Sequence, residues 1–317
     1  RDVLGSRGLG DVYKRQLKGL ILADKKLDFK VDYSKLNIFD EYNSKDIKFP
    51  MVLSVPHKGM LFPEEFLANS RCGIDELRSN EDSFVDELVK RASDAGIPMV
   101  AMNIARSFVD VNRDKIELDP TMFYNHPHAN ESNIGGRRCR VGLGVIHRIT
   151  AKNHSIYDGL LDYNEVTERF ARVYDPYHKK LQQLIDKVIK KFGFCLVLDC
   201  HSMPSEICSL MQDTAKIDFC LGTLFEQSCP AEMHDIFKQQ LEEDGYNVAD
   251  NCPYSGAYIT FNYCQPRKGI YTMQMEINRG LYMNERVYKK NNAFSILSDN
   301  ICKAILRLGN FLLDLKK

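Results

Sequence analysis

The sequence predicts an α/β fold organised around an open sheet, and two observations support this class. Short apolar runs at 50–56, 99–104 and 196–198 show no polar alternation, which is typical of strands buried on both faces. Longer segments with apolar residues at helical spacing occur at 82–95, 160–191 and 293–316. Open α/β sheets place ligand sites above the carboxyl ends of their strands, so the residues that follow each apolar run are the first functional candidates.

The remaining elements follow in order along the chain. The helix at 82–95 stops at Gly96, and the pattern at 160–191 is interrupted at Pro176, which has no backbone N–H to continue a helix. Further elements are a strand at 217–222, a charged surface helix at 231–243, a turn-rich loop at 251–260 that runs into a strand, and a strand at 271–279. In the last helix, the expected inward residues are Ile296, Leu297, Ile301, Ile305, Leu308 and Leu312.

The composition is ordinary for a globular protein and excludes several functional classes. The 317 residues carry 43 basic and 43 acidic side chains, so no bulk charge attracts nucleic acid or an anionic membrane. No apolar run approaches the roughly 20 residues that span a bilayer. The 10 cysteines are scattered without a C-x-x-C pair, which favours reduced thiols over disulfides. We therefore expect a cytoplasmic protein that binds neither nucleic acid nor a membrane.

Residues 1–16 differ from the rest of the chain. They have no clear periodicity and no continuous apolar core of a secretory signal, and they resemble a translated adapter sequence. We expect a non-native or disordered extension here, with a native flexible extension as the alternative. The length allows one large or two modest domains with a sizeable core, and we expect residues 17–317 to form a single domain.

Two histidines follow buried strands and could meet in one crevice. His201 comes after the apolar run at 196–198, and Asp199 points to the same side of the strand, where it could orient the imidazole ring. His57 follows the strand at 50–56 in the same way. Each histidine alone could simply satisfy a buried hydrogen bond. Together they supply two corners of a zinc site, and the pair favours a metal.

Two acidic residues could complete such a site. Asp82 or Ser83 is well placed to cap the first long helix, but the Asp82 carboxylate could instead turn toward a metal. Glu276 lies inside a strand whose faces are both expected to be covered, and burying a lone carboxylate is costly unless it is paired or bound near a metal. Such a glutamate suits a general base that activates water, and the alternative is a salt bridge to Arg279 or Arg113.

Basic residues in the loops that follow suit an anionic ligand. Asn112 and Arg113 are adjacent, which suits bidentate capture of a carboxylate, with a surface salt bridge as the alternative. The connection at 114–140 includes Arg137 and Arg138, and so long a loop is usually functional or mobile. That basic cluster could lean over an anionic substrate, but we favour a solvated cluster.

The segment Gly142-Leu143-Gly144 contains a G-x-G pattern. It lacks the third glycine of a dinucleotide fingerprint, so a nucleotide site is excluded there.

Six short motifs occur in one order along the chain. They are SVPH at 54–57, DVNR at 110–113, GLGVI at 142–146, DPYH at 175–178, DCHSMP at 199–204 and EINRGLYM at 276–283. As an ordered set over roughly residues 48–290, they resemble the N-formylglutamate amidohydrolase family. The resemblance implies cleavage of N-formyl-L-glutamate to formate and L-glutamate, late in one route of histidine degradation. That family is similar to the zinc carboxypeptidases and the aspartoacylase group, which implies a three-layer α/β/α sandwich around a mixed, mostly parallel sheet.

The wider resemblance implies a Zn2+ site at His57, Asp82 and His201. The segment at 199–202 is similar to the carboxypeptidase D-x-H-S strand, whose histidine binds zinc, and His57 takes the place of the first histidine ligand. Carboxypeptidases have a glutamate three residues after that histidine, whereas this sequence has Met60. The second-ligand role therefore falls to another acid, for which Asp82 is our choice. The alternatives are Glu81 and Glu64.

The same resemblance assigns the remaining roles. Glu276 takes the place of the catalytic glutamate. The candidate substrate-binding residues are Asn112, Arg113, Arg148, Tyr258 and Arg279. Asn112 and Arg113 are similar to the pair that grips an α-carboxylate, and an anionic N-formyl amino acid with two carboxylates needs more than one cation. Tyr258 follows a segment in which relatives usually show a Gly-Gly pair, so selectivity there can differ.

Two other classes of function fit the same residues. One is a metallohydrolase that acts on another N-acyl amino acid or a small peptide, and the other is a catalytically silent binding protein on the same scaffold. A Ser-His-Asp hydrolase does not fit, because the sequence has no G-x-S-x-G elbow. Both a monomer and a homo-oligomer are compatible with the sequence.

Overall fold

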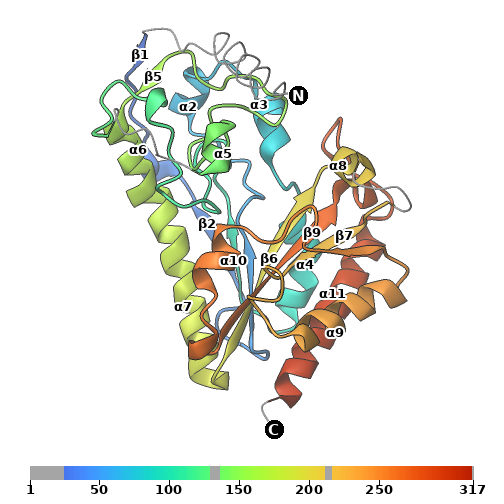
Figure 1. The fold of residues 1–317 in the computed structure, drawn as a ribbon. Coiled ribbons are helices and arrows are strands. Elements are labelled where there is room, and N and C mark those ends of the chain that lie inside the picture. Colours follow the sequence, from blue (N-terminus) through green and yellow to red (C-terminus); the bar gives the residue numbers. More distant parts are fainter. Residues whose placement is uncertain (1–24, 129–135, 211–215, 316–317) are drawn as a thin grey trace, which may run out of the picture.

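The computed structural model describes residues 25–128, 136–210 and 216–315, and the expected extension at 1–16 lies outside them. One mixed sheet has seven strands in the order β2-β4-β3-β6-β9-β7-β8 (Figure 1). Their bounds are β2 Phe39–Tyr42, β4 Met99–Met102, β3 Met51–Val55, β6 Cys195–Met203, β9 Ile270–Asn278, β7 Phe219–Gly222 and β8 Val248–Asp250. Strands β4, β3, β6 and β9 are parallel, whereas β2 is antiparallel to β4 and β7 is antiparallel to β9. The expected mixed, mostly parallel sheet is confirmed.

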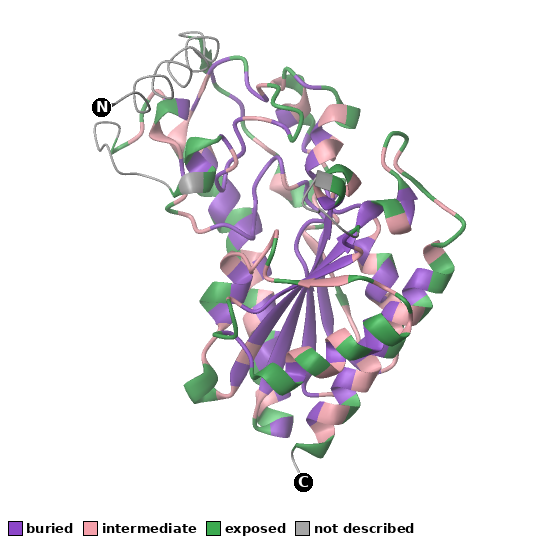
Figure 2. Cartoon of the chain, turned by 45° about the vertical axis from the view of Figure 1, so that its right-hand side comes forward, coloured by how far each residue is buried: buried purple, intermediate pink, exposed green. Residues whose placement is uncertain are grey.

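Helices cover both faces of this sheet and complete three layers (Figure 1). One face carries α7 (Asp175–Phe192) and α10 (Tyr258–Tyr263), and the other carries α4 (Val85–Asp94), α9 (Ala231–Glu243) and α11 (Phe294–Asp314). In β3, Val52 packs into the core under α7 while Leu53 packs into the core under α4 and α11. Both faces of the central strands are therefore buried (Figure 2), which explains why their sequences show no polar alternation.

Shorter elements lie mostly beyond the carboxyl ends of the parallel strands (Figure 1). The helices among them are α2 (Glu64–Ala68), α3 (Ile74–Leu77), α5 (Arg137–Arg140), α6 (Tyr163–Arg169) and α8 (Ser205–Leu210). The short strand pairs are β1 (Lys26–Leu27) with β5 (Leu160–Leu161), and β10 (Met283–Asn284) with β11 (Lys289–Lys290). Among the described residues, no helix has the length and apolar character needed to cross a bilayer.

Two predictions differ from the structure, one in the type of an element and one in the face of a helix. Short apolar runs do not distinguish helix from strand, which accounts for the first. The loop at 251–260 runs into the helix α10, not into a strand, and the Thr260 hydroxyl accepts a hydrogen bond from the Ala257 backbone N–H at its start. In α11 the predicted inward face is correct except at Ile296, which is 64% exposed. Residue 296 lies off the stripe formed by the other five positions, since each residue turns a helix by about 100°.

The starts of two helices also differ from expectation. Helix α4 begins at Val85 after Phe84, which has a left-handed backbone with φ 68°, so neither Asp82 nor Ser83 caps it through a side chain. The pattern at 160–191 is interrupted before Pro176, by a π-helical turn at Phe170–Tyr174. Pro176 itself lies in the first turn of α7, where its missing N–H costs nothing. The Asp82 side chain is thereby free for another role.

The topology opens a crevice above β3 and β6. From β3 the chain passes through α4 to β4 on one side, and it later enters β6 on the other side. Connections that leave neighbouring strands in opposite directions leave a gap beyond the carboxyl ends, where ligands bind in open α/β sheets.

Candidate active site

The strands that carry the predicted metal-binding and catalytic residues end at the same edge of the sheet. His57 follows the last residue of β3 by two positions, and His201 and Glu276 lie near the carboxyl ends of β6 and β9. His201 and Glu276 are direct partners in the parallel register of these strands. Each is at least nine-tenths buried. The sheet therefore brings together residues that are far apart in the sequence.

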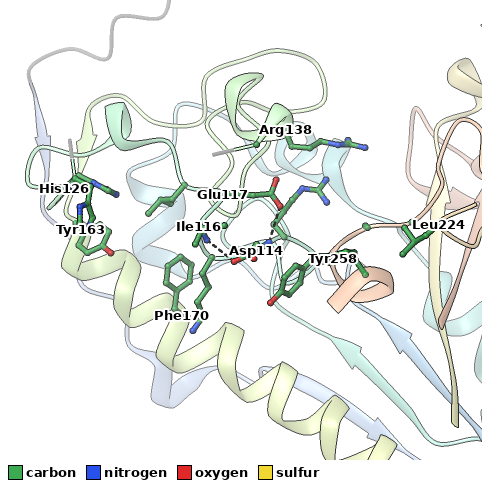
Figure 3. Close-up of a pocket in the computed structure, with 17 residues that line it drawn as sticks. Asp114, Ile116, Glu117, His126, Arg138, Tyr163, Phe170, Leu224 and Tyr258 are labelled. Atoms are coloured by element: carbon green, nitrogen blue, oxygen red, sulfur yellow. Dashed lines mark hydrogen bonds between the residues drawn. The ribbon is translucent and has the colours of Figure 1, made fainter. Parts of the chain in front are cut away.

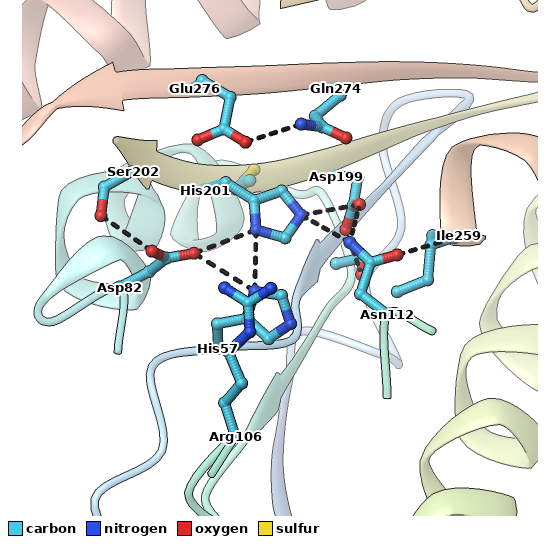
Figure 4. A network of polar contacts seen from close by, with 12 residues as sticks. His57, Asp82, Arg106, Asn112, Asp199, His201, Ser202, Ile259, Gln274 and Glu276 are labelled. Carbon is cyan, nitrogen blue, oxygen red and sulfur yellow. Dashed lines mark hydrogen bonds and ion pairs between the residues drawn. The ribbon is translucent and has the colours of Figure 1, made fainter. Parts of the chain in front are cut away.

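His57, Asp82 and His201 form a buried cluster that could hold a metal ion (Figure 4). The Nδ1 atoms of the two histidines are 3.1 Å apart. Asp82 Oδ2 lies 3.0 Å from His201 Nδ1 and 3.3 Å from His57 Nδ1. One potential ligand atom from each side chain thus points at a common centre, as a metal site with an open position requires.

The outer nitrogens of both rings are held by carboxylates. His57 Nε2 donates to Asp110 Oδ1 at 2.7 Å, and His201 Nε2 donates to Asp199 Oδ2 at 2.8 Å. With Nε2 bonded to a carboxylate, each Nδ1 is left to bind the cation at the common centre, either a proton or a metal ion in its place, and this is the pattern typical of metal-binding histidines. The expected orienting role of Asp199 agrees with this hydrogen bond, and Asp110 holds His57 in the same way.

Asp110 is itself fixed by a hydrogen-bonded chain. The Ala151 backbone N–H donates to Asn80 Oδ1, so the Asn80 amide must donate to His147 Nδ1, at 2.7 Å. The His147 proton then lies on Nε2, which faces Asp110 Oδ2 at 3.3 Å. Burial lowers the pKa of His147 to about 4, so this ring is neutral at neutral pH. The chain keeps Asp110 an acceptor toward His57.

The electrostatics of the cluster favour a cation. Burial alone would raise the pKa of Asp82, but hydrogen bonds from His201 and His57 hold it well below its usual value. Burial alone would lower the pKa of His201, but Asp199, Asp82 and Glu276 raise it well above its usual value. The remaining Asp82 oxygen, Oδ1, accepts from Arg279 Nη2 at 3.0 Å, which fixes the carboxylate in place.

Glu276 has no ion pair with the described residues, which contradicts the salt-bridge alternative within that part of the chain. Its Oε1 accepts a 2.7 Å hydrogen bond from the Gln274 amide (Figure 4). Burial, with a further contribution from the Asp82 charge, raises the pKa of Glu276 to about 7. A carboxylate with a raised pKa beside a potential metal site can accept and return a proton near neutral pH.

A cavity of about 280 Å³ contains this site and joins a larger one. The cluster histidines, Asp82, Glu276 and four arginines line the inner cavity; the arginines are Arg106, Arg113, Arg138 and Arg279. The outer cavity, of about 1030 Å³, is shown in Figure 3. The two cavities share Arg113 and Arg138. A small anion could therefore enter past two basic side chains.

Asn112 and Arg113 both line the inner cavity, but their side chains are held by different kinds of hydrogen bond. The Asn112 amide donates to Asp199 Oδ2 at 3.0 Å, and its oxygen accepts from the Ile259 backbone N–H at 2.7 Å. Arg113 donates only to backbone carbonyls, those of Asn112 and Leu143. Burial and neighbouring positive charges lower the pKa of Arg113 to about 10, which still leaves it charged. Its ion pair with Asp110 is long, at 3.9 Å from Nε to Oδ2, and that oxygen accepts from Arg106 at 2.8 Å. Arg113 is therefore a desolvated cation that its carboxylate neighbour neutralises only weakly.

Comparisons with known proteins place this site in a family. The model of the family described as N-formylglutamate amidohydrolase matches residues 49–283. The chain belongs to this family. The matched segment contains all three members of the buried cluster and Glu276.

Individual members of the family support the same assignment. The chain is 28% identical to the N-formylglutamate deformylase of Pseudomonas putida over 75% of its length and 83% of the relative's. It is 25% identical to the corresponding deformylase of Pseudomonas aeruginosa, over 75% and 84% of the two chains. The crystal structure of N-formylglutamate amidohydrolase from Ralstonia eutropha JMP134 covers 87% of this chain and 99% of its own, at 28% identity and a TM-score of 0.81. A second structure, a gene product of Agrobacterium tumefaciens at 16% identity and a TM-score of 0.61, shares the fold.

The structure distinguishes the three acids that were candidates for the carboxylate ligand of the metal. Asp82 joins the two histidines, whereas Glu81 forms an ion pair with Arg78 and accepts from Ser83. Glu64 is the first residue of α2 and is not part of the cluster.

The predicted substrate-binding residues are only partly brought together. Arg113, Asn112 and Arg279 line the inner cavity, but Arg279 is held by Asp82 and Ser202. Arg148 is paired with Asp119 at 2.8 Å and does not line the cavity. Tyr258 begins α10 and lines the outer cavity only.

Several residues that line or support the site were not singled out from the sequence. Arg106 donates through Nε to Asp110 Oδ2 at 2.8 Å, and its guanidinium lines the inner cavity. Tyr254 also lines it, and burial with the nearby Glu276 charge raises the pKa of Tyr254 to about 12. The DVNR motif did carry Asp110, but its partners Asn80 and His147 are distant in sequence and gave no local signal.

Proposed function

We propose that this protein hydrolyses the amide bond of N-formyl-L-glutamate and releases formate and L-glutamate. The observation that carries the proposal is the common cavity of the His57-Asp82-His201 cluster and Glu276, in a chain of the N-formylglutamate amidohydrolase family. We assign residues 17–317 to one catalytic domain and place the reaction in histidine degradation in the cytoplasm. The free, mostly buried cysteines are compatible with a reducing compartment.

The proposed cofactor is Zn2+, held by His57, Asp82 and His201. Two imidazoles and one carboxylate with a vacant fourth direction match the donor sets of catalytic zinc sites. A zinc ion bound there would lower the pKa of water and polarise a carbonyl group. Asp110 and Asp199 act through the outer ring nitrogens, where they keep both histidines in the ligand-ready tautomer.

Glu276 is the proposed general base. It takes a proton from the attacking water and delivers it to the departing amine nitrogen of glutamate. Its hydrogen bond from Gln274 positions one oxygen and leaves the other for this transfer. Arg106 is our candidate for stabilising the oxyanion that develops on the formyl oxygen, because Asp110 holds only its Nε and its guanidinium lines the cavity.

The charge around the cavity matches an anionic substrate. Four arginines line it, and four carboxylates, Asp82, Asp110, Asp199 and Glu276, lie on it or directly behind the two histidines. These charges cancel, so a divalent cation would leave two positive charges in excess. N-formyl-L-glutamate carries two negative charges, and Arg113 with Asn112 is placed to meet its α-carboxylate.

The experiment that tests this function measures formate release from N-formyl-L-glutamate by the purified protein, before and after dialysis against a chelator. We expect turnover that the chelator abolishes and zinc restores. Activity that survives complete removal of metal would exclude the metal mechanism. A panel of other N-acyl amino acids run in parallel distinguishes a related amidase, and a lack of hydrolysis of every compound would indicate a binding protein.

A further inference from the structure

The site must bind a substrate with two carboxylates, yet most of its arginines are already paired. Arg106 donates to Asp110, Arg279 is paired with Asp82, and Arg148 outside the cavity is paired with Asp119. Each of these pairs is buried or nearly so, and releasing the arginine would leave an uncompensated carboxylate. These three residues are therefore poor anchors for a second substrate carboxylate.

Arg138 differs from them. It forms no hydrogen bond or ion pair with any residue of 25–128, 136–210 or 216–315. It lines both the inner and the outer cavity, and Figure 3 shows its side chain extending from α5 over the space between Glu117 and Leu224. Its positive charge acts on two residues that line the inner cavity. It contributes to lowering the pKa of Arg113, and it opposes the rise in the pKa of Tyr254.

The Gly142-Leu143-Gly144 segment holds Arg138 next to Arg113. The Leu143 backbone N–H donates to the Arg138 carbonyl at 2.9 Å, while the Leu143 carbonyl accepts from Arg113 Nε at 3.3 Å. Gly142 has a φ of +83°, and a Cβ on Gly144 would lie 2.3 Å from the Glu117 carbonyl oxygen, so both positions favour glycine. The G-x-G segment is not a nucleotide site; its central residue, Leu143, is hydrogen-bonded to both arginines and therefore fixes their relative positions.

We propose that Arg138 binds the side-chain carboxylate of the substrate while Arg113 binds its α-carboxylate, so that Arg138 sets the preference for a dicarboxylic amino acid. This inference rests on the proposed function. Both cations line the two cavities; Arg138 has no carboxylate partner in the described part of the chain, and Arg113 has only a long contact with Asp110, at 3.9 Å. Such a pair raises the local concentration of an anion and favours one with two negative groups. Arg138 thus takes the role that the sequence analysis gave to Arg148 or Arg279.

The test compares two substrates that differ in one group. N-formyl-L-glutamine has nearly the size of N-formyl-L-glutamate but a neutral amide in place of the side-chain carboxylate. In the zinc-loaded enzyme, Arg138→Gln should lower kcat/KM for N-formyl-L-glutamate about 10- to 50-fold, mainly through KM, because a charge-assisted hydrogen bond at a partly exposed site is lost. For N-formyl-L-glutamine, kcat/KM should stay within about twofold. Arg138→Lys should keep part of the preference.

The matched control is Arg140→Gln, which removes the same charge from the same short helix at a position that lines neither cavity. It should leave both substrates unaffected. An equal loss on both substrates in Arg138→Gln, or no loss on either, overturns the proposal.

Binding of L-glutamate and L-glutamine, measured by calorimetry, separates this inference from the proposed function. If the wild-type protein releases no formate, the proposed function fails. The role of Arg138 is still supported if the wild type prefers L-glutamate and Arg138→Gln loses that preference. It is overturned if the wild type has no preference or if the variant keeps it.

Discussion

Two clusters of buried charge in this molecule are built in opposite ways. The guanidinium of Arg169 is fully buried, and each of its three nitrogens lies within hydrogen-bond or ion-pair distance of an acceptor. Its Nε donates to Glu165 at 2.8 Å, its Nη1 donates to the Phe108 carbonyl and the Tyr157 hydroxyl, and its Nη2 is 2.6 Å from Glu165 Oε2. One cation and one anion neutralise each other, so this cluster needs no ligand.

The cluster at the ends of β3 and β6 is as deeply buried, but its acceptors converge. The Nδ1 atoms of His57 and His201 and the Oδ2 atom of Asp82 face one another, and the cavity with Glu276 opens beside them. Burial of charge therefore does not by itself indicate function. Converging lone pairs that border a cavity do indicate a ligand, and the predictions below test this distinction.

The largest effect is expected from His201→Ala. Loss of one of three ligands should remove bound zinc and lower formate release by about 10⁴-fold or more, to the background rate. Metal content after dialysis and formate release measure the two effects, and circular dichroism checks the fold. His234→Ala is the control, because His234 lies on α9 with Asp235 and Asp250 as partners. Normal metal occupancy in His201→Ala would contradict the ligand role.

Glu276→Gln should separate chemistry from metal binding. The amide keeps the shape of the side chain but cannot accept the proton, so kcat should fall about 10²- to 10⁴-fold while zinc stays bound. In the wild type, kcat/KM should decrease as pH falls through the pKa of Glu276, because only the deprotonated carboxylate is a base. That pKa is about 7 before the charge of a metal lowers it. An active variant that retains the acid limb of the pH profile would remove Glu276 from the mechanism.

Arg169→Met should lower the stability of the fold without affecting catalysis or zinc binding. It leaves Glu165 buried without its partner, which typically costs about 3–5 kcal/mol of stability. Urea unfolding should report that loss, while kcat and zinc content of the folded protein stay at wild-type values. The double variant Arg169→Met with Glu165→Leu should recover much of the stability, since both charges are then absent. A selective loss of zinc in Arg169→Met would erase the contrast between the clusters.

The same contrast explains what the sequence could predict. His57, His201 and Glu276 were found because each lies in or directly after an apolar strand, and the ends of parallel strands meet at one edge of a sheet. Asp82 was chosen among three acids. Its side chain does not cap α4, because the left-handed Phe84 delays the start of that helix to Val85. Local patterns carry this information.

Arg106, Asp110 and His147 were not found because their roles arise only from contacts between distant segments. The choice between Arg138 and Arg148 depends on how α5 and the glycine turn lie over the cavity, which no periodicity encodes. Orienting residues and substrate anchors on loops are therefore less predictable than ligands on strands.

The smallest effect is expected at His147, which touches no ligand and acts through Asp110. His147→Leu removes the donor to Asp110 Oδ2 but leaves the donor from Arg106, so zinc affinity should fall only about 10-fold. His147→Gln can place an amide N–H near the position of Nε2 and should recover most of that affinity. Competition with a chromophoric chelator measures both variants. A purely packing role for His147 predicts the reverse order, because leucine fills the buried space beside Asn80 as well as glutamine does, without a polar group to satisfy.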